Sequence, residues 1–69
     1  MTLQIGEWYF KVRPSRVEMG AGKAFIAWCA KTPNLEDGPL LVDPNLDVHA
    51  EFGNTADEAL GKLKREVLN

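Results

Sequence analysis

The residues of this 69-residue chain best suited to chemistry are its one cysteine, Cys29, and its one histidine, His49. A cysteine nucleophile needs a base beside it, and Cys29 lies in an apolar segment, where a structural thiol is inert. His49 has no second histidine and no acid–base partner at a motif spacing, so we expect it to face solvent or a subunit interface. These residues form no catalytic set, and we expect a protein that is not an enzyme.

Two other patterns suggest ligands but lack the required spacing. The loop acids Asp37, Asp43 and Asp47 could suggest calcium, yet the D-x-[DN]-x-[DN]-G order of an EF-hand loop is absent. Gly20 and Gly22 stand in G-A-G, and no helix pattern with a phosphate-facing N-terminus follows them, so a hairpin turn is the better interpretation. The sequence therefore predicts no metal and no cofactor.

Length and composition predict one small folded domain, residues 1–69. The hydrophobic content of 45% is enough for a core, but a domain of this size is marginal by itself and gains from a partner subunit. The single cysteine excludes a disulfide within the chain and fits a reducing compartment. Neither a secretory signal nor a run of about 20 apolar residues is visible, so we expect a cytoplasmic protein without membrane contact.

Charge is spread unevenly along the chain. Five basic and two acidic residues give residues 1–34 a charge of +3, whereas three basic and eight acidic residues give residues 35–69 a charge of −5. Such a distribution can steer a partner, although small domains also scatter charge by chance.

Alternating apolar residues predict an antiparallel sheet. Residues 7–13 and 47–52 alternate with the period of half-buried strands, while residues 23–31 are apolar on both faces, which is typical of a strand covered on both sides. Leu40–Val42 could form a short extra strand. We therefore expect an α+β fold, with an antiparallel meander of three strands, or four if Leu40–Val42 pairs, followed by one helix on one sheet face.

Residues 55–68 carry a strong helix pattern. Thr55 and Glu58 form a capping box, in which the threonine hydroxyl accepts the Glu58 N–H and the glutamate carboxylate reaches back to the Thr55 N–H. Apolar residues recur at three- and four-residue intervals along one face, and Glu58 and Lys62 form an i,i+4 pair. Gly61 interrupts the pattern, and we expect it to allow a close approach to a neighbouring element.

The segment GNTADEAL, residues 53–60, resembles the G-[DN]-T-x-x-E-A-[LI] element of the HicB-like antitoxin domain family. GKAFIAWCAKTPN, residues 22–34, is similar to the second strand of that family, and WYFKVR, residues 8–13, occupies the place of the first. The resemblance implies a module that binds a small RNA-cleaving toxin. The C-terminal DNA-binding module of complete antitoxins has no counterpart in these residues, and a longer segment replaces the family's proline-glycine-cysteine corner.

Two alternative surfaces follow for a non-enzymatic interaction module. One helix can cover one sheet face only, so either Phe25 or the pair Ile26 and Trp28 should face outward, and we expect a homodimer or a heteromer with a small protein on that set. The alternative is a nucleic-acid-binding domain, in which Tyr9, Lys11 and Arg13 line an open sheet face that stacks bases and pairs phosphates.

Overall fold

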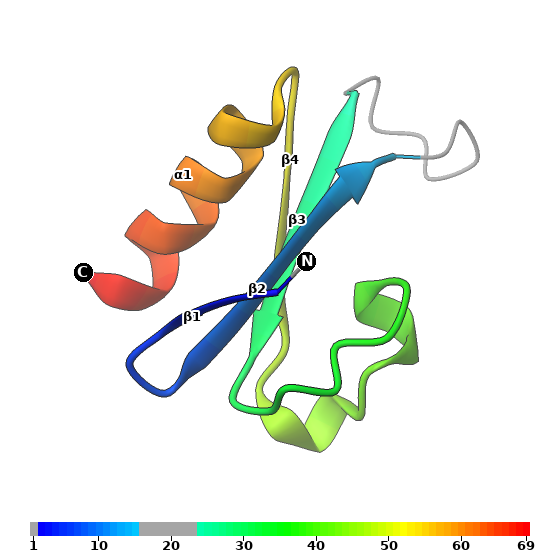
Figure 1. Cartoon of the computed structure of the whole chain (residues 1–69), viewed down its shortest axis with the longest axis vertical. Coiled ribbons are helices and arrows are strands. Elements are labelled where there is room, and N and C mark those ends of the chain that lie inside the picture. The colour runs from blue at the N-terminus through cyan, green and yellow to red at the C-terminus, as the bar shows by residue number, and fades with distance from the viewer. Residues whose placement is uncertain (1, 16–23) are drawn as a thin grey trace.

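The computed structural model describes residues 2–15 and 24–69, which form one antiparallel sheet with a helix at the C-terminal end (Figure 1). The sheet has the order β1-β2-β3-β4, so each strand pairs with the next along the chain. The prediction of an α+β meander followed by one C-terminal helix is confirmed. The predicted turn residues Gly20 and Gly22 lie outside the described residues. The elements are β1 (Leu3–Ile5), β2 (Trp8–Pro14), β3 (Phe25–Ala30), two 3₁₀ helices (Pro39–Leu41 and Pro44–Leu46), β4 (His49–Gly53) and α1 (Ala56–Leu68).

The fourth strand is β1 and not Leu40–Val42, so the expectation of an extra strand at Leu40–Val42 is wrong. Pro39 opens a 3₁₀ helix there, and the Val42 N–H donates to the Pro39 carbonyl. A proline without an N–H favours such a turn over a sheet ladder. At the other end of the chain, Ile5 pairs with Trp8 across a two-residue turn in which Gly6 adopts a φ of 61°. Glycine takes that conformation without strain.

The two faces of β3 belong to two separate hydrophobic clusters. Ala27 and Cys29 lie on the face that α1 covers, and Ile26, Trp28 and Ala30 lie on the opposite face. The helix-side cluster also contains Phe10, Ala59 and Leu63. The expectation that β3 is buried on both faces is confirmed.

The second face of β3 is covered by residues 31–48, the connection between β3 and β4, which we call the strap. Figure 1 shows the strap and α1 on opposite sides of the sheet. Leu35 and Val42 of the strap are buried against Ile26 and Trp28. The Trp28 indole N–H donates to the Leu35 carbonyl at 2.7 Å, which satisfies the one polar group of the largest buried side chain.

The N-terminus of α1 forms as predicted in its main contact. Thr55 is the N-cap, and its hydroxyl accepts the Glu58 N–H at 3.0 Å. The second half of the capping box differs from the expectation, because the Glu58 carboxylate lies 3.5 Å from the Lys62 ammonium. The i,i+4 pair has therefore displaced the reciprocal cap.

Two glycines near α1 have opposite roles. A Cβ on Gly53 would lie 2.9 Å from the Ala59 Cα and 3.0 Å from the Glu58 carbonyl carbon. Only glycine therefore allows the end of β4 to pack this closely against the backbone of α1. A Cβ on Gly61 would meet no atom within 4 Å. The expectation that Gly61 allows a close approach within the chain is wrong, since the tight contact is at Gly53.

We predict that Gly53→Ala and Gly61→Ala change stability in opposite directions. Gly53→Ala should lower the free energy of unfolding by about 1–3 kcal/mol, because the clash is with backbone that cannot move aside. Gly61→Ala should raise it by about 1 kcal/mol, the difference in helix propensity. Urea unfolding followed by circular dichroism measures both, and equal effects of the two substitutions would contradict the assignment of the close contact to Gly53.

Candidate functional site

The side chains predicted to form an open nucleic-acid face are instead beneath and beside the strap. The Lys11 ammonium donates to the Glu36 carbonyl at 3.0 Å, and the Arg13 Nε donates to the Asp37 carbonyl at 2.7 Å. Tyr9 packs against the strap-side cluster. The expectation that these three residues line an open face is wrong, because the strap occupies that face and accepts their hydrogen bonds.

The residues predicted to form an exposed interface are also covered within the chain. Ile26 and Trp28 are 1% and 0% exposed beneath the strap. Phe25 is partly buried and packs on the helix-side cluster. The premise that either Phe25 or the pair Ile26 and Trp28 is exposed to solvent is therefore wrong. The strap, which has no long helix, covers the sheet face opposite α1.

Cys29 is fully buried in the helix-side cluster. Burial raises the pKa of the Cys29 thiol to about 11, although a hydrogen bond from the His49 backbone opposes the shift. The thiolate is the nucleophilic form of cysteine, so this thiol is held in its unreactive state at neutral pH.

His49 has acidic neighbours that its sequence spacing did not indicate. Its Nε2 lies 3.1 Å from the Asp47 Oδ1, and its Nδ1 lies 3.6 Å from the Glu66 Oε1. The ring also meets Trp8 edge-on at 5.5 Å between centroids. Glu66 comes from α1, so only the packing of the helix on β4 brings it to the histidine.

Glu66 also lies close to a second carboxyl group, that of Glu51 on β4. The pKa of the Glu51 carboxyl is raised, first by desolvation and then by a hydrogen bond and charge repulsion from Glu66, with Lys62 opposing. The Lys62 ammonium also donates to the Phe52 carbonyl at 3.3 Å. The His49–Glu66 contact and the Lys62–Phe52 hydrogen bond join the second half of α1 to β4, whereas the Glu51–Glu66 pair opposes them. Over the described ranges 2–15 and 24–69, no group of three or more His, Cys, Asp or Glu residues could hold a metal ion.

The most exposed apolar residues of the described chain lie on the strap. Leu40 and Leu41 are 91% and 65% exposed on the first 3₁₀ helix, and Leu46 on the second is also exposed. Beside them a groove of about 410 Å³ is lined by Pro39, Leu40, Val42, Pro44, Val48 and Ala50. We call Leu40, Leu41, Leu46 and this groove the leucine surface. The sequence analysis missed it by placing Leu40–Val42 in a strand, although the preceding Gly38-Pro39 pair is a turn signal.

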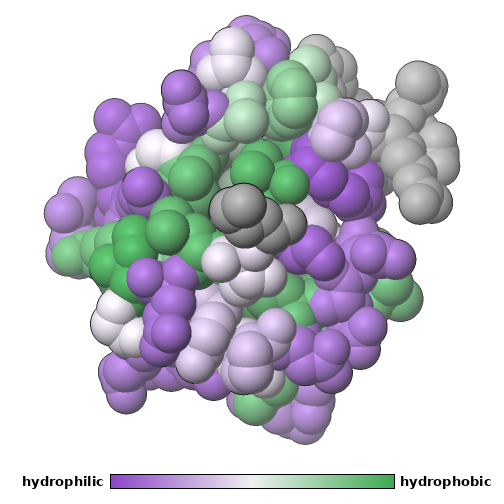
Figure 2. Space-filling view, in the orientation of Figure 1, coloured by the Kyte–Doolittle hydropathy of each residue, from purple (hydrophilic) through white to green (hydrophobic). Residues whose placement is uncertain are grey.

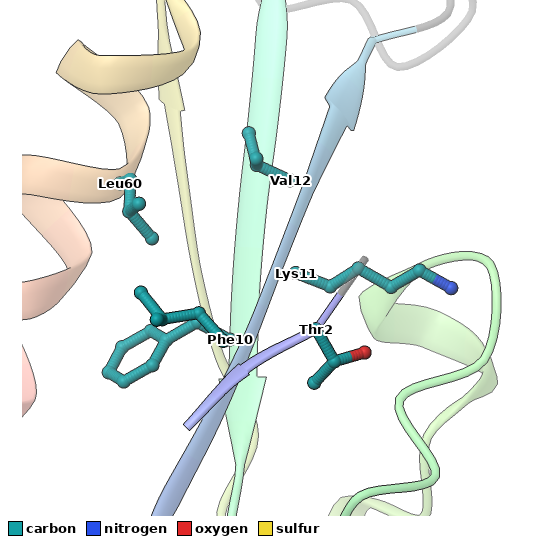
Figure 3. Close-up of a pocket in the computed structure, with 6 residues that line it drawn as sticks. Thr2, Phe10, Lys11, Val12 and Leu60 are labelled. Carbon is teal, nitrogen blue, oxygen red and sulfur yellow. The ribbon is translucent and has the colours of Figure 1, made fainter. Parts of the chain in front are cut away.

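A second apolar groove lies on the helix side of the sheet. It has a volume of about 230 Å³ and is lined by Thr2, Leu3, Phe10, Lys11, Val12 and Leu60. Figure 3 shows Leu60 of α1 facing Phe10 and Val12 of β2 across this groove. Figure 2 shows hydrophobic side chains gathered in the same region, between α1 and the sheet. The groove exists because α1 leaves part of β1 and β2 uncovered.

No protein-family model matches this sequence, and the comparisons with curated proteins and with solved structures also give no match. In the part of the chain that the structure describes, no helix is long and apolar enough to cross a membrane. The leucine surface is therefore interpreted from its own geometry.

We predict that Glu51→Gln stabilises the protein at pH 7. A raised pKa means that the folded state favours the protonated carboxyl, so its contribution to stability is present below about pH 4, the unfolded value, and is lost as pH rises. Glutamine mimics the protonated form and removes the repulsion from Glu66. The gain should be below about 1 kcal/mol because the pair is largely solvated.

Urea unfolding at pH 7 and pH 4 tests this, with Glu36→Gln as the control for a loop carboxylate away from Glu66. The advantage of Glu51→Gln should shrink at pH 4. A destabilising effect at pH 7 would show that Lys62, rather than Glu66, dominates the surroundings of Glu51.

Proposed function

We propose that this protein is a non-enzymatic protein-interaction module that binds its partner on the leucine surface. The observation that carries the proposal is the exposure of Leu40 and Leu41. Single exposed leucines are ordinary, but adjacent ones beside an apolar groove are typical of an interaction site.

The strap presents these leucines in a defined arrangement. Its inner side is anchored by hydrogen bonds from Trp28, Lys11 and Arg13 to three successive carbonyls, those of residues 35–37. Leu41 and Leu46 each donate their N–H to a carbonyl three residues earlier, which closes the 3₁₀ turns. An ordered surface loses less conformational entropy on binding than a mobile one.

The resemblance to the HicB-like antitoxin domain family supports the same class of function. In the antitoxin form of the proposal, the partner is a small toxin-like protein. The cytoplasmic location belongs to this proposal as well, and its support is the lone cysteine, Cys29.

Self-association stays a prediction, but a homodimer would need a surface other than the one expected from the sequence. The homodimer expected on Phe25, Ile26 or Trp28 would need residues that the chain itself covers. The groove of Leu3, Phe10, Val12 and Leu60 is the apolar surface on the helix side that a second copy could use. The nucleic-acid alternative also stays a prediction, but it has less support, because Lys11 and Arg13 donate to strap carbonyls and Tyr9 packs against the strap-side cluster.

We predict that the double variant Leu40→Ser, Leu41→Ser stays folded and loses its partner. Both side chains are exposed, so their replacement should change the free energy of unfolding by no more than about 0.5 kcal/mol. The partner should be recovered from the native extract with the wild type and be depleted at least about tenfold with the variant, a loss of roughly 1.4 kcal/mol.

Leu68→Ser is the matched control, because Leu68 is an exposed leucine at the end of α1. Sedimentation equilibrium of the same proteins shows whether the bound partner is a second copy. Equal recovery with the wild type and the double variant would contradict the assignment of function to the leucine surface.

A further inference from the structure

The alternation of hydrogen-bonded pairs defines which way the backbone of β3 faces. The Ser15 N–H donates to the Ala24 carbonyl at 2.9 Å, and the next pair, Pro14 and Phe25, includes a residue with no N–H to donate. Opposed residues in an antiparallel ladder alternate between hydrogen-bonded and non-hydrogen-bonded pairs. The backbone groups of Ile26 and Trp28 therefore face β2.

The same alternation continues into β4. Ala27 and Cys29 turn their backbone groups toward Glu51 and His49, their register partners. Ala50, between these two partners, must then direct its N–H and C=O to the outer edge of the sheet, where β4 is the last strand. Phe52 has the same orientation as Ala50, which explains how the Lys62 ammonium of α1 reaches its carbonyl.

Ala50 also places its side chain on the strap side of the sheet. It is exposed and lines the groove of the leucine surface together with Val48. A strand added beside β4 would direct every second side chain to this same side. The free backbone of Ala50 and the apolar groove are therefore arranged for one extended ligand, whose main chain pairs at the edge while alternate side chains enter the groove.

Charge around the groove indicates the chemistry of that ligand. Residues 32–48 contain four carboxylates, of which Asp37 already lies 4.0 Å from the Lys11 ammonium. Asp43 stands between the lining residues Val42 and Pro44 on the strap side. The Asp47 carboxylate, 67% exposed, lies beside the His49 ring on the helix side of the same edge, where Glu51 also lies opposite Ala27. A basic segment complements this rim.

We propose that the outer edge of β4 is a strand-addition site for an extended, basic segment of the partner protein. The proposal rests on the proposed function and names the binding mode at the same surface. The segment pairs its main chain with Ala50, places apolar side chains in the groove and directs the alternate lysine or arginine side chains to the helix side of the edge, toward Asp47 and Glu51. Lys62 covers the Phe52 carbonyl in the free protein, as charged side chains do at edges that must not pair indiscriminately.

A fluorescein-labelled peptide in which lysine and valine alternate tests the site by fluorescence anisotropy. Two further peptides carry N-methyl groups on every second residue, one on the valines and the other on the lysines, which removes one set of backbone donors and keeps the side chains. In a paired strand, only every second residue directs its backbone N–H toward β4, so either the valine amides or the lysine amides make the hydrogen bonds. We therefore expect one of the two N-methylated peptides to bind at least about tenfold more weakly than the parent peptide and the other to bind like it. A peptide with glutamate in place of lysine should bind weakly.

The variant Ala50→Pro removes the outward N–H, and proline is tolerated at the outer side of an edge strand. We expect it to weaken the parent peptide at least about tenfold, while the matched variant Ala50→Ser retains the N–H and the binding. If Ala50→Pro does not fold, the N-methylated peptides on the wild type decide. Equal binding of both N-methylated frames, or a parent peptide that does not bind, would overturn the strand-addition site.

Recovery of the native partner separates this proposal from the proposed function. Loss with both Ala50→Pro and the variant Leu40→Ser, Leu41→Ser supports strand addition at the leucine surface. Loss with the leucine variant alone would mean that the partner docks on the strap without pairing with β4, which overturns strand addition and leaves the interaction module standing.

Discussion

Burial of β3 on both faces is the constraint on which the rest of this structure depends. A strand with apolar side chains on both sides needs two covers. One helix supplies the first, because α1 packs Ala59 and Leu63 against the helix-side face. The strap supplies the second, and it can do so because the Trp28 indole N–H finds the Leu35 carbonyl. Without that acceptor, burial of the indole would cost about 1–3 kcal/mol.

A cover built from irregular chain has consequences for the surface. The strap needs side-chain donors to satisfy its inner carbonyls, and Lys11 and Arg13 of β2 supply them. These cations are thereby used for structure at the face where an open sheet would have offered them to phosphates. The outer side of the strap then carries Leu40 and Leu41 into solvent. The cover that closes the core thus creates the surface that we propose for binding.

Much of this fold is predictable from local pattern. The period-two alternation around Phe10 and the Thr55 cap are short-range signals, and both are confirmed. The strap is not predictable in this way, because two of the three hydrogen bonds that anchor its carbonyls, those from Lys11 and Arg13, join residues more than 20 positions apart. The His49–Glu66 contact is also not visible in the sequence pattern, since it exists only once α1 lies on β4. Sequence pattern therefore indicated that β3 needs two covers but not what the second one is.

Hydrogen exchange of the Trp28 indole N–H, followed by NMR, tests the role of the strap most directly. If the strap is an integral cover of the core, this proton should exchange as slowly as the backbone amides of β3, through global unfolding. The indole N–H of Trp8, which is only partly buried, provides the internal comparison. A Trp28 proton that exchanges as fast as that of Trp8 would show that the strap opens independently, and the account of a doubly covered central strand would be wrong.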